Sequence, residues 1–302
     1  MLGMRGAEAA GARFNLNEVC MLALPLLDAL IDHALDEDLA GGDLTTEACV
    51  AEDAKATAEA VARKPLVVCG GAVFRRVFER LDPSIEFEVL EADGARVAVG
   101  TVIWRIRGKA RVLLQGERTA LNLAQRMSGV ATQARTYIEA LPEGSEVRIT
   151  DTRKTTPGLR ALERYGVRVG GAHNHRDNLG SAVMIKDNHI VAAGGITAAI
   201  ERARKRAPHT SRIEVEVASL VELEEALAAG ADIIMLDNFS IEDVREASRR
   251  AKAHPRRPLL EVSGGITLER IGILAGAGID VISVGALTHS APAADIALDL
   301  KL

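Results

Sequence analysis

The sequence is poor in aromatic residues and carries no excess of positive charge. Aromatic residues make up 3% of the 302 residues, so few rings are available on which nucleobases could stack. The net charge of -5 supplies no overall positive field that would hold a polyanion. We therefore expect no nucleic-acid partner, and any local cluster of cations needs a local explanation.

Cysteine is scarce as well. Cys20, Cys49 and Cys69 are odd in number and lack C-x-x-C spacing, which argues against both a disulfide framework and a zinc site. The apolar run at residues 19–31 is interrupted by Pro25 and is too short to span a bilayer. These features favour a cytoplasmic protein without a membrane segment.

The pattern of the chain changes near residue 109, and its length suits two domains. Before that point, a helical pattern at about residues 24–35 and the loop GGDLTTE precede short β-like runs such as KPLVVCGG, IEFEVLEAD and GTVIWRIRG. Residues 110–141 have apolar side chains at helical spacing, which predicts one or two helices that link the domains. The Ala- and Gly-rich residues 1–17 are expected to form a flexible tail.

Six β-rich runs alternate with helical patterns after residue 146, which predicts a parallel sheet, either doubly wound or closed as a barrel. The runs are EVRITDT, AVMIKDNH, RIEVEV, DIIMLDN, LLEVSGG and DVISVGAL. We favour a barrel, because each run has a chemically useful residue at or just past its carboxyl end, where barrel side chains converge on one mouth. These residues are Asp151, Lys186, Glu216, Asp237, Ser263 and Gly285.

Cations gather in three separate segments of this region. They are Arg153 and Lys154 in DTRKTTPGLR, His175 and Arg176 in NHR, and Lys186 in IKDNH. Any one of them could decorate the surface, but the set at strand ends suits a small ligand with more than one carboxylate or phosphate. We expect His175 to donate a hydrogen bond to that ligand.

Acidic residues and glycines complete the predicted mouth. Glu216 and Asp237 could bind a hydrated Mg²⁺ that holds phosphates, accept hydrogen bonds from sugar hydroxyls, or simply pair with Lys186. Two glycine-containing loops could cradle a phosphate with backbone N–H groups, although glycine in such turns often serves the backbone alone. The residues of these loops are Ser263, Gly264, Gly265, Gly285 and Ala286.

At these residues the chain resembles the nicotinate-nucleotide pyrophosphorylases (carboxylating), also called quinolinate phosphoribosyltransferases. The matching segments are LDEDLAGGDLTTE, GERTALN, DTRKTTPGLR, NHR, IKDNH, EVEV, IIMLDN, EVSGGI and ISVGALTHS. The resemblance implies an incomplete parallel α/β barrel over residues 125–290. It also implies an N-terminal α/β sandwich domain over residues 18–124, joined by residues 291–302.

The resemblance further implies a decarboxylating phosphoribosyl transfer in NAD biosynthesis. Quinolinate and 5-phosphoribosyl 1-pyrophosphate would give nicotinate mononucleotide, CO₂ and pyrophosphate, with Mg²⁺ held through water by Glu216 and Asp237. The enzyme is expected to be a homodimer with shared active sites, or a higher oligomer that contains this dimer. The implied quinolinate ligands are Arg118 from the adjacent subunit, Arg153, Lys154, His175, Arg176 and Lys186. The implied ligands of the phosphoribosyl donor are Glu216, Asp237, Ser263, Gly264, Gly265, Gly285 and Ala286, and the catalytic set is Lys154, Lys186, Glu216 and Asp237.

Three alternatives stay open at this point. A family paralogue linked to molybdenum transport genes, whose substrate is unclear, is a close rival, but retention of IKDNH favours quinolinate. A sugar-phosphate aldolase could use Lys186 as a Schiff base, and a third possibility is a metabolite-binding protein without catalysis. The chain departs from the family's usual pattern at Ala172 and Ser181, which implies an altered loop rather than lost chemistry, because all the cations persist.

Overall fold

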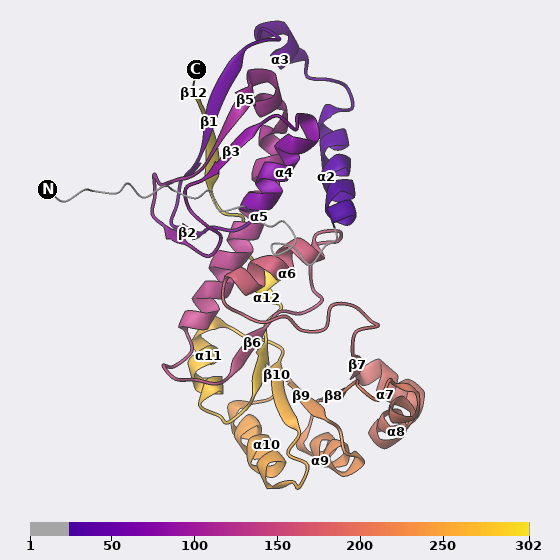
Figure 1. Cartoon of the computed structure of the whole chain (residues 1–302). Helices are drawn as coiled ribbons and strands as arrows, with labels where there is room; N and C mark the ends of the chain where they lie inside the picture. The colour runs from indigo at the N-terminus through magenta and orange to yellow at the C-terminus, as the bar shows by residue number, and fades with distance from the viewer. Residues whose placement is uncertain (1–23, 302) are drawn as a thin grey trace, which may run out of the picture.

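Strands with one buried face build an antiparallel sheet from both ends of the chain. The computed structural model describes residues 24–301, so the tail predicted over residues 1–17 and Cys20 lie outside the described residues. The sheet has the order β12-β1-β5-β3, which brings the last strand beside the first (Figure 1). Its strands are β1 (Lys55–Ala62), β3 (Glu86–Val89), β5 (Val102–Lys109) and β12 (Ile296–Lys301), and β2 (Leu66–Val67) pairs separately with β4 (Arg96–Val97).

Helices pack against this sheet and enclose an apolar core that contains Phe74, Phe78 and Trp104. They are α2 (Leu24–Leu39), α3 (Leu44–Cys49), α4 (Gly71–Leu81) and the start of α5 (Ala110–Glu139). A loop was the expectation at GGDLTTE, but part of this segment forms α3, because the Asp43 carboxylate accepts the N–H of Thr46 at 2.9 Å and caps the helix.

One long helix links the two halves of the molecule. The sequence predicts one or two helices over residues 110–141, and the structure has a single one, α5, which runs from the antiparallel sheet to the junction with α6 (Arg160–Val169) and α12 (Ala286–His289) (Figure 1). Gly129 of α5 lies so close to the Pro292 carbonyl that a Cβ would come within 2.0 Å of its oxygen. This approach lets the returning chain cross α5 on its way to β12.

The second half contains the parallel sheet, in the order β6-β11-β10-β9-β8-β7. Its strands are β6 (Arg148–Thr150), β7 (Val183–Ile185), β8 (Ile213–Val217), β9 (Ile233–Asp237), β10 (Leu259–Ser263) and β11 (Val281–Ser283). Beyond β6 the sheet gains a single bridge, between Thr150 and His173, and among residues 24–301 no strand closes the gap to β7. The predicted incomplete parallel α/β barrel with an N-terminal α/β sandwich is therefore confirmed.

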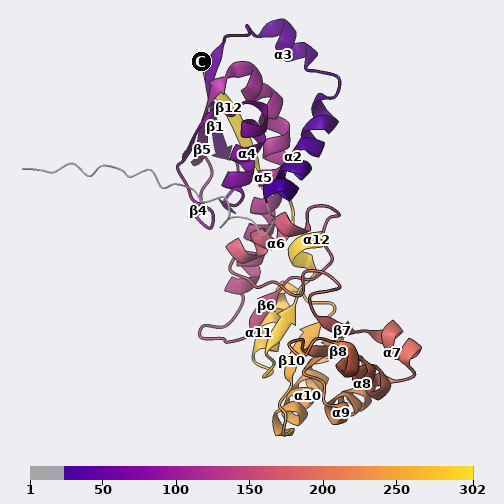
Figure 2. The ribbon, with the colours of Figure 1, turned by 45° about the vertical axis from the view of Figure 1, so that its right-hand side comes forward.

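Residues of alternate parity on these strands face opposite sides, as the two-residue period requires. On β8, Val215 is buried among helix side chains, whereas Glu214 and Glu216 face the barrel interior with the cavity-lining Glu261. The outer helices, visible in Figure 2, are α7 (Asp187–Ala193), α8 (Ile196–Arg206), α9 (Leu220–Ala229), α10 (Ile241–Ala253) and α11 (Leu268–Ala275). No helix of residues 24–301 is long and apolar enough to cross a membrane.

Candidate active site

The carboxyl ends of the parallel strands surround a cavity of about 300 Å³, a size that suits a small molecule. Six of the sequence-predicted site residues line it together, as expected for side chains that converge on a barrel mouth. They are Arg153, Lys154, His175, Arg176, Lys186 and Ser263, and the remaining lining residues are Thr152, Met184, Met235, Glu261 and Ser283.

Two arginines line this cavity, and Nη1 of Arg176 donates to the Ala182 carbonyl oxygen at 3.1 Å. The Nε atoms of Arg153 and Arg176 are buried, and neither has a hydrogen-bond partner within residues 24–301. Burial, together with repulsion from Arg153, lowers the pKa of Arg176. A buried donor without a partner is costly, so an anionic ligand in the cavity would relieve this cost twice.

Both ring nitrogens of His175 contact protein groups. Nδ1 accepts the N–H of Arg176 at 2.7 Å, so the ring proton lies on Nε2, which is 3.4 Å from Glu214 Oε2 and 3.5 Å from Glu261 Oε2. Burial alone lowers the pKa of His175, but hydrogen bonds to the two carboxylates outweigh it and raise the pKa to about 10. This raised pKa favours a second proton, but that proton would have to sit on Nδ1, where the N–H of Arg176 already donates, and this backbone contact favours the ring that is protonated on Nε2 alone. Because both ring nitrogens contact protein groups, hydrogen-bond donation from His175 to a ligand stays a prediction.

The same tautomer argues against a metal ion between His175, Glu214 and Glu261, although their ligand atoms lie within 4.8 Å of one another. A metal-bound imidazole normally carries its proton on the other nitrogen and donates it to a neighbour. Here Nδ1 is the acceptor of the Arg176 N–H, which leaves Nε2 as the protonated nitrogen. We therefore describe His175, Glu214 and Glu261 as a cluster of interacting side chains next to the cations of the cavity.

Sequence reasoning missed Glu214 and Glu261, each only 3% exposed. The pattern that could have identified them was available, because Glu214 precedes Glu216 by two residues and Glu261 precedes Ser263 by two. Alternation along a strand then puts each glutamate on the same inward face as its partner. Burial raises the pKa of Glu214, which is consistent with its place inside the barrel.

Lys186 and Glu216 form an ion pair at the ends of β7 and β8. On the next strand, Asp237 accepts a hydrogen bond from the side-chain amide of Asn238 at 2.9 Å. Asn238 has a φ of 55°, and a Cβ on Gly264 would come within 2.3 Å of its Oδ1. The pairing with Lys186 that the sequence left open is therefore present for Glu216. In the loop after β10, a side chain at Gly264 would collide with Asn238, so this glycine has a steric reason.

The other predicted residues are not among those that line the cavity. A Cβ on Gly285 would come within 3.2 Å of the Lys154 side chain, and the Thr288 hydroxyl donates to the Lys154 carbonyl at 2.8 Å. Ala286 starts α12, and Gly265 follows Gly264 with a φ of 57°. Arg118 is exposed on α5 and is not among the residues that line the cavity.

Two domain families match this chain. Residues 43–128 match the N-terminal domain and residues 130–299 the C-terminal domain of quinolinate phosphoribosyl transferase. The "Probable nicotinate-nucleotide pyrophosphorylase [carboxylating]" of Bacillus subtilis is 44% identical over 276 residues, which cover 91% of this chain and 94% of that protein.

A human relative and a solved structure extend the match. The human nicotinate-nucleotide pyrophosphorylase [carboxylating] is 42% identical over 275 residues, 91% of each chain. The solved nicotinate-nucleotide pyrophosphorylase of Francisella tularensis superposes with a TM-score of 0.87 at 38% identity, covering 95% of this chain and all of that one. The chain therefore belongs to the quinolinate phosphoribosyl transferase family.

Proposed function

We propose that this protein transfers the phosphoribosyl group of 5-phosphoribosyl 1-pyrophosphate to quinolinate and releases CO₂ and pyrophosphate, forming nicotinate mononucleotide. The observation that carries this proposal is the pair of buried, unpartnered Nε atoms of Arg153 and Arg176 in one cavity. Two planar guanidinium groups suit the two neighbouring carboxylates of quinolinate, since each can bind a carboxylate bidentately.

The residues around the cavity suit each step of this transfer. The pyridine nitrogen bonds to the anomeric carbon while the C–O bond to pyrophosphate breaks and its electron pair leaves with that group. Glu216 and Asp237 would stabilise the positive charge that develops on the ribose. Once the ring nitrogen is quaternary, the bond to CO₂ breaks, its electron pair stays on the ring carbon, and Lys154 or Lys186 would donate the proton.

Glu216 and Asp237 also suit a magnesium ion, because they offer only oxygen atoms and stand at the ends of adjacent strands. Bound there through water, Mg²⁺ would neutralise the pyrophosphate as it leaves. The pairing of Lys186 with Glu216 leaves this amine engaged, which does not favour a Schiff base at that lysine. We place the reaction in the cytoplasm, where the thiols of Cys49 and Cys69 would stay reduced.

The direct test uses purified protein and quinolinate labelled in the carboxylate next to the ring nitrogen. Labelled CO₂ should appear only when both 5-phosphoribosyl 1-pyrophosphate and Mg²⁺ are present. Nicotinate should be a poor substrate, because it leaves one of the two arginines unpaired in a desolvated site. Absence of labelled CO₂ under every combination of donor and metal would contradict the assignment.

We propose further that the protein is a homodimer in which Arg118 completes the active site of the adjacent subunit. Arg118 is exposed on α5 and is not among the cavity residues of its own chain, which suits contact with a second copy. In a mixed dimer of Arg118→Ala and Lys186→Ala subunits, one site has both defects and the other has neither.

Random exchange between these two inactive homodimers should restore roughly a quarter of wild-type activity, because half of the dimers are mixed and each has one intact site. Exchange is followed by native mass spectrometry. If mixed dimers form and activity stays at the level of the parents, Arg118 acts within its own subunit or not at all.

A further inference from the structure

The segment that carries His175 and Arg176 has little regular structure of its own. It lies between α6 and β7, and its one ladder contact is the bridge between His173 and Thr150. Yet Arg176, whose Nε is buried, must be held at a defined distance from Arg153 if both are to meet one ligand. Something outside the segment therefore has to fix its backbone.

Asp151 fixes it from the strand side. This carboxylate is 0% exposed, and its Oδ1 accepts the N–H of His175 at 2.7 Å. Its Oδ2 accepts the side-chain amide of Asn174 at 2.6 Å. Because Asp151 precedes Arg153 by two residues, the same carboxylate ties the backbone of one cationic segment to the backbone of the other.

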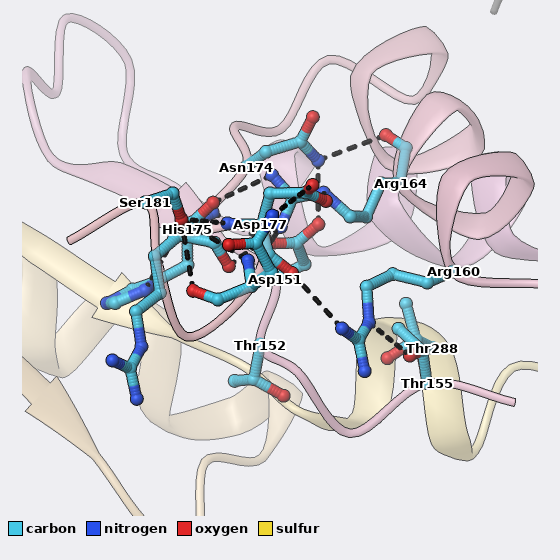
Figure 3. Close-up of polar contacts among 12 residues, drawn as sticks. Asp151, Thr152, Thr155, Arg160, Arg164, Asn174, His175, Asp177, Ser181 and Thr288 are labelled. Carbon is cyan, nitrogen blue, oxygen red and sulfur yellow. Dashed lines mark hydrogen bonds and ion pairs between the residues drawn. The ribbon is translucent and has the colours of Figure 1, made fainter. Parts of the chain in front are cut away.

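Arg164 of α6 fixes the segment from the opposite side. Its guanidinium donates to the carbonyl oxygens of His175 at 2.7 Å and Arg176 at 3.0 Å. It also lies 3.7 Å from Asp151 and 3.5 Å from Asp177, while only 4% of the side chain is exposed. Figure 3 shows Asp151, Arg164 and the loop residues around them converging on one another. An arginine with several donors in a fixed plane can satisfy such a set at once.

We propose that Asp151 and Arg164 are positioning residues that set the relative placement of Arg153 and Arg176 and so determine affinity for quinolinate. This inference rests on the proposed function. A buried ion pair is weak evidence of stabilisation, because desolvation of both charges offsets their attraction. Within residues 24–301, the side-chain hydrogen bonds of Asp151 and Arg164 go to the Asn174 amide, the His175 N–H and the carbonyl oxygens of His175 and Arg176. All of these groups lie in one short segment, which gives the pair a local task.

A merely structural role predicts a different result from a positioning role. Loss of general stability lowers the amount of folded enzyme and affects the use of both substrates alike. Displacement of Arg176 instead weakens the site for the dicarboxylate and spares the phosphoribosyl donor, whose proposed ligands stand on β8, β9 and β10 and in the loops after β10 and β11. The two KM values therefore separate the two roles.

Arg164→Lys and Asp151→Asn are the informative variants. In Arg164→Lys, the lysine keeps the charge but cannot donate to both carbonyl groups at once, because it lacks the planar guanidinium. In Asp151→Asn, the amide NH₂ faces one of the two N–H groups whose hydrogen bonds the Asp151 carboxylate accepts, so that hydrogen bond is lost. In each variant we expect the KM for quinolinate to rise about 10-fold to 100-fold and the KM for the donor to change less than about threefold. Binding of quinolinate in the absence of the phosphoribosyl donor, measured by calorimetry, should weaken by a similar factor.

Arg204→Lys is the matched control, because Arg204 also holds a loop carbonyl, that of Gly230, at 2.6 Å, but does so away from the cavity. It should leave both KM values unchanged. Where Asp151→Asn or Arg164→Lys fails to fold, Asp177→Asn removes an outer contact of Arg164 and should raise the KM for quinolinate in the same direction. Equal changes in both KM values, or none in a folded variant, would overturn the inference.

The binding experiment also separates this inference from the proposed reaction. If the wild type binds the dicarboxylate but makes no nucleotide, the proposed function fails while loss of binding in Arg164→Lys still supports the positioning role. If the wild type turns quinolinate over and Arg164→Lys binds it as tightly as the wild type, the positioning role fails alone.

Discussion

The two halves of the molecule place their charged side chains differently. Around the antiparallel sheet, the core is apolar and aromatic, and ion pairs such as Arg76 with Asp28 and Arg63 with Asp299 lie at its margin. The buried carboxylate of this sheet, Glu59, has its own partner in Arg105. In the barrel, charged side chains are buried inside, among them Asp151, Arg164 and Glu261. Charge at the margin interferes little with packing, whereas charge in the interior requires compensation by hydrogen bonds or by a ligand.

The difference indicates which half is built for chemistry. The barrel interior of a purely structural domain would be filled by branched apolar residues. Here Glu214 and Glu261 contact His175 in the interior. The Nε atoms of Arg153 and Arg176 have no hydrogen-bond partner within residues 24–301. Under the proposed function, the carboxylates of the substrate would supply the partners that these arginines lack in the protein.

The largest effect we expect concerns stability and tests the apolar half. Phe78 is fully buried, its ring centroid lies 5.2 Å from that of Phe74, and a Cβ on Gly116 would come within 2.7 Å of it. Phe78→Ala should lower the free energy of unfolding by about 3–5 kcal/mol, through lost burial and the cavity that remains. The fluorescence of Trp104, the single tryptophan, reports this core during urea unfolding.

Leu44→Ala is the control for this variant, since the side chain of Leu44 is 81% exposed. It should change the unfolding free energy by less than about 0.5 kcal/mol. Activity per folded molecule should stay near wild type in both variants at low temperature. A fall in activity without a fall in stability would mean that the core around Phe78 also contributes to the chemistry, in addition to the contact proposed for Arg118.

The next effect concerns activity and tests the charged half. Arg176→Met removes a guanidinium while keeping much of the apolar stem, so kcat/KM for quinolinate should fall about 10²-fold to 10³-fold. The free energy of unfolding should fall little or even rise, because the variant loses one hydrogen bond to the Ala182 carbonyl but no longer buries an Nε–H without a partner. Arg63→Met, on the margin of the other half, is the control and should leave kcat/KM unchanged.

The sequence predicted the barrel and its mouth because both follow from short-range rules. Runs rich in Val and Ile predicted the six parallel strands. Lys154 and Lys186 each follow such a run, and this position predicted that they line the cavity. The helices α4 and α6 were not predicted. In α6, Gly166 interrupts the helical pattern, and its reason appears only in three dimensions, since a Cβ there would come within 2.9 Å of the Met127 carbonyl.

Long-range contacts were the part that could not be derived. Arg164 stands on a surface-like pattern in RALERYGVRV, and nothing in that pattern connects it with Asp151 or with the carbonyl of Arg176. Glu214 differs, because the two-residue period of EVEV was sufficient to turn it inward. The sequence therefore located the strands that carry the buried charges, but it could not identify the partner of each charge.

The smallest effect concerns pH and compares a carboxylate from each half. The hydrogen bonds from Arg76 lower the pKa of Asp28, whereas burial raises the pKa of Asp151. Asp28 thus contributes stability above the ordinary Asp pKa of about 4, and this contribution is lost as the pH falls through the lower folded-state pKa. For Asp151 the sign is reversed, because the native protein binds its proton more readily than the unfolded chain does.

Asp28→Asn should therefore cost about 0.5–1 kcal/mol near neutral pH, and the difference from wild type should shrink as the pH falls below about 4. The difference between wild type and Asp151→Asn should instead grow on acidification, because protonation relieves the wild type of a buried charge that the variant never had. Urea unfolding of the three proteins between about pH 7 and pH 3 measures both slopes. If the two differences in unfolding free energy change with pH in the same direction, Asp28 and Asp151 do not differ in the sign of their pKa shifts. The contrast between margin and interior would then not extend to pH dependence.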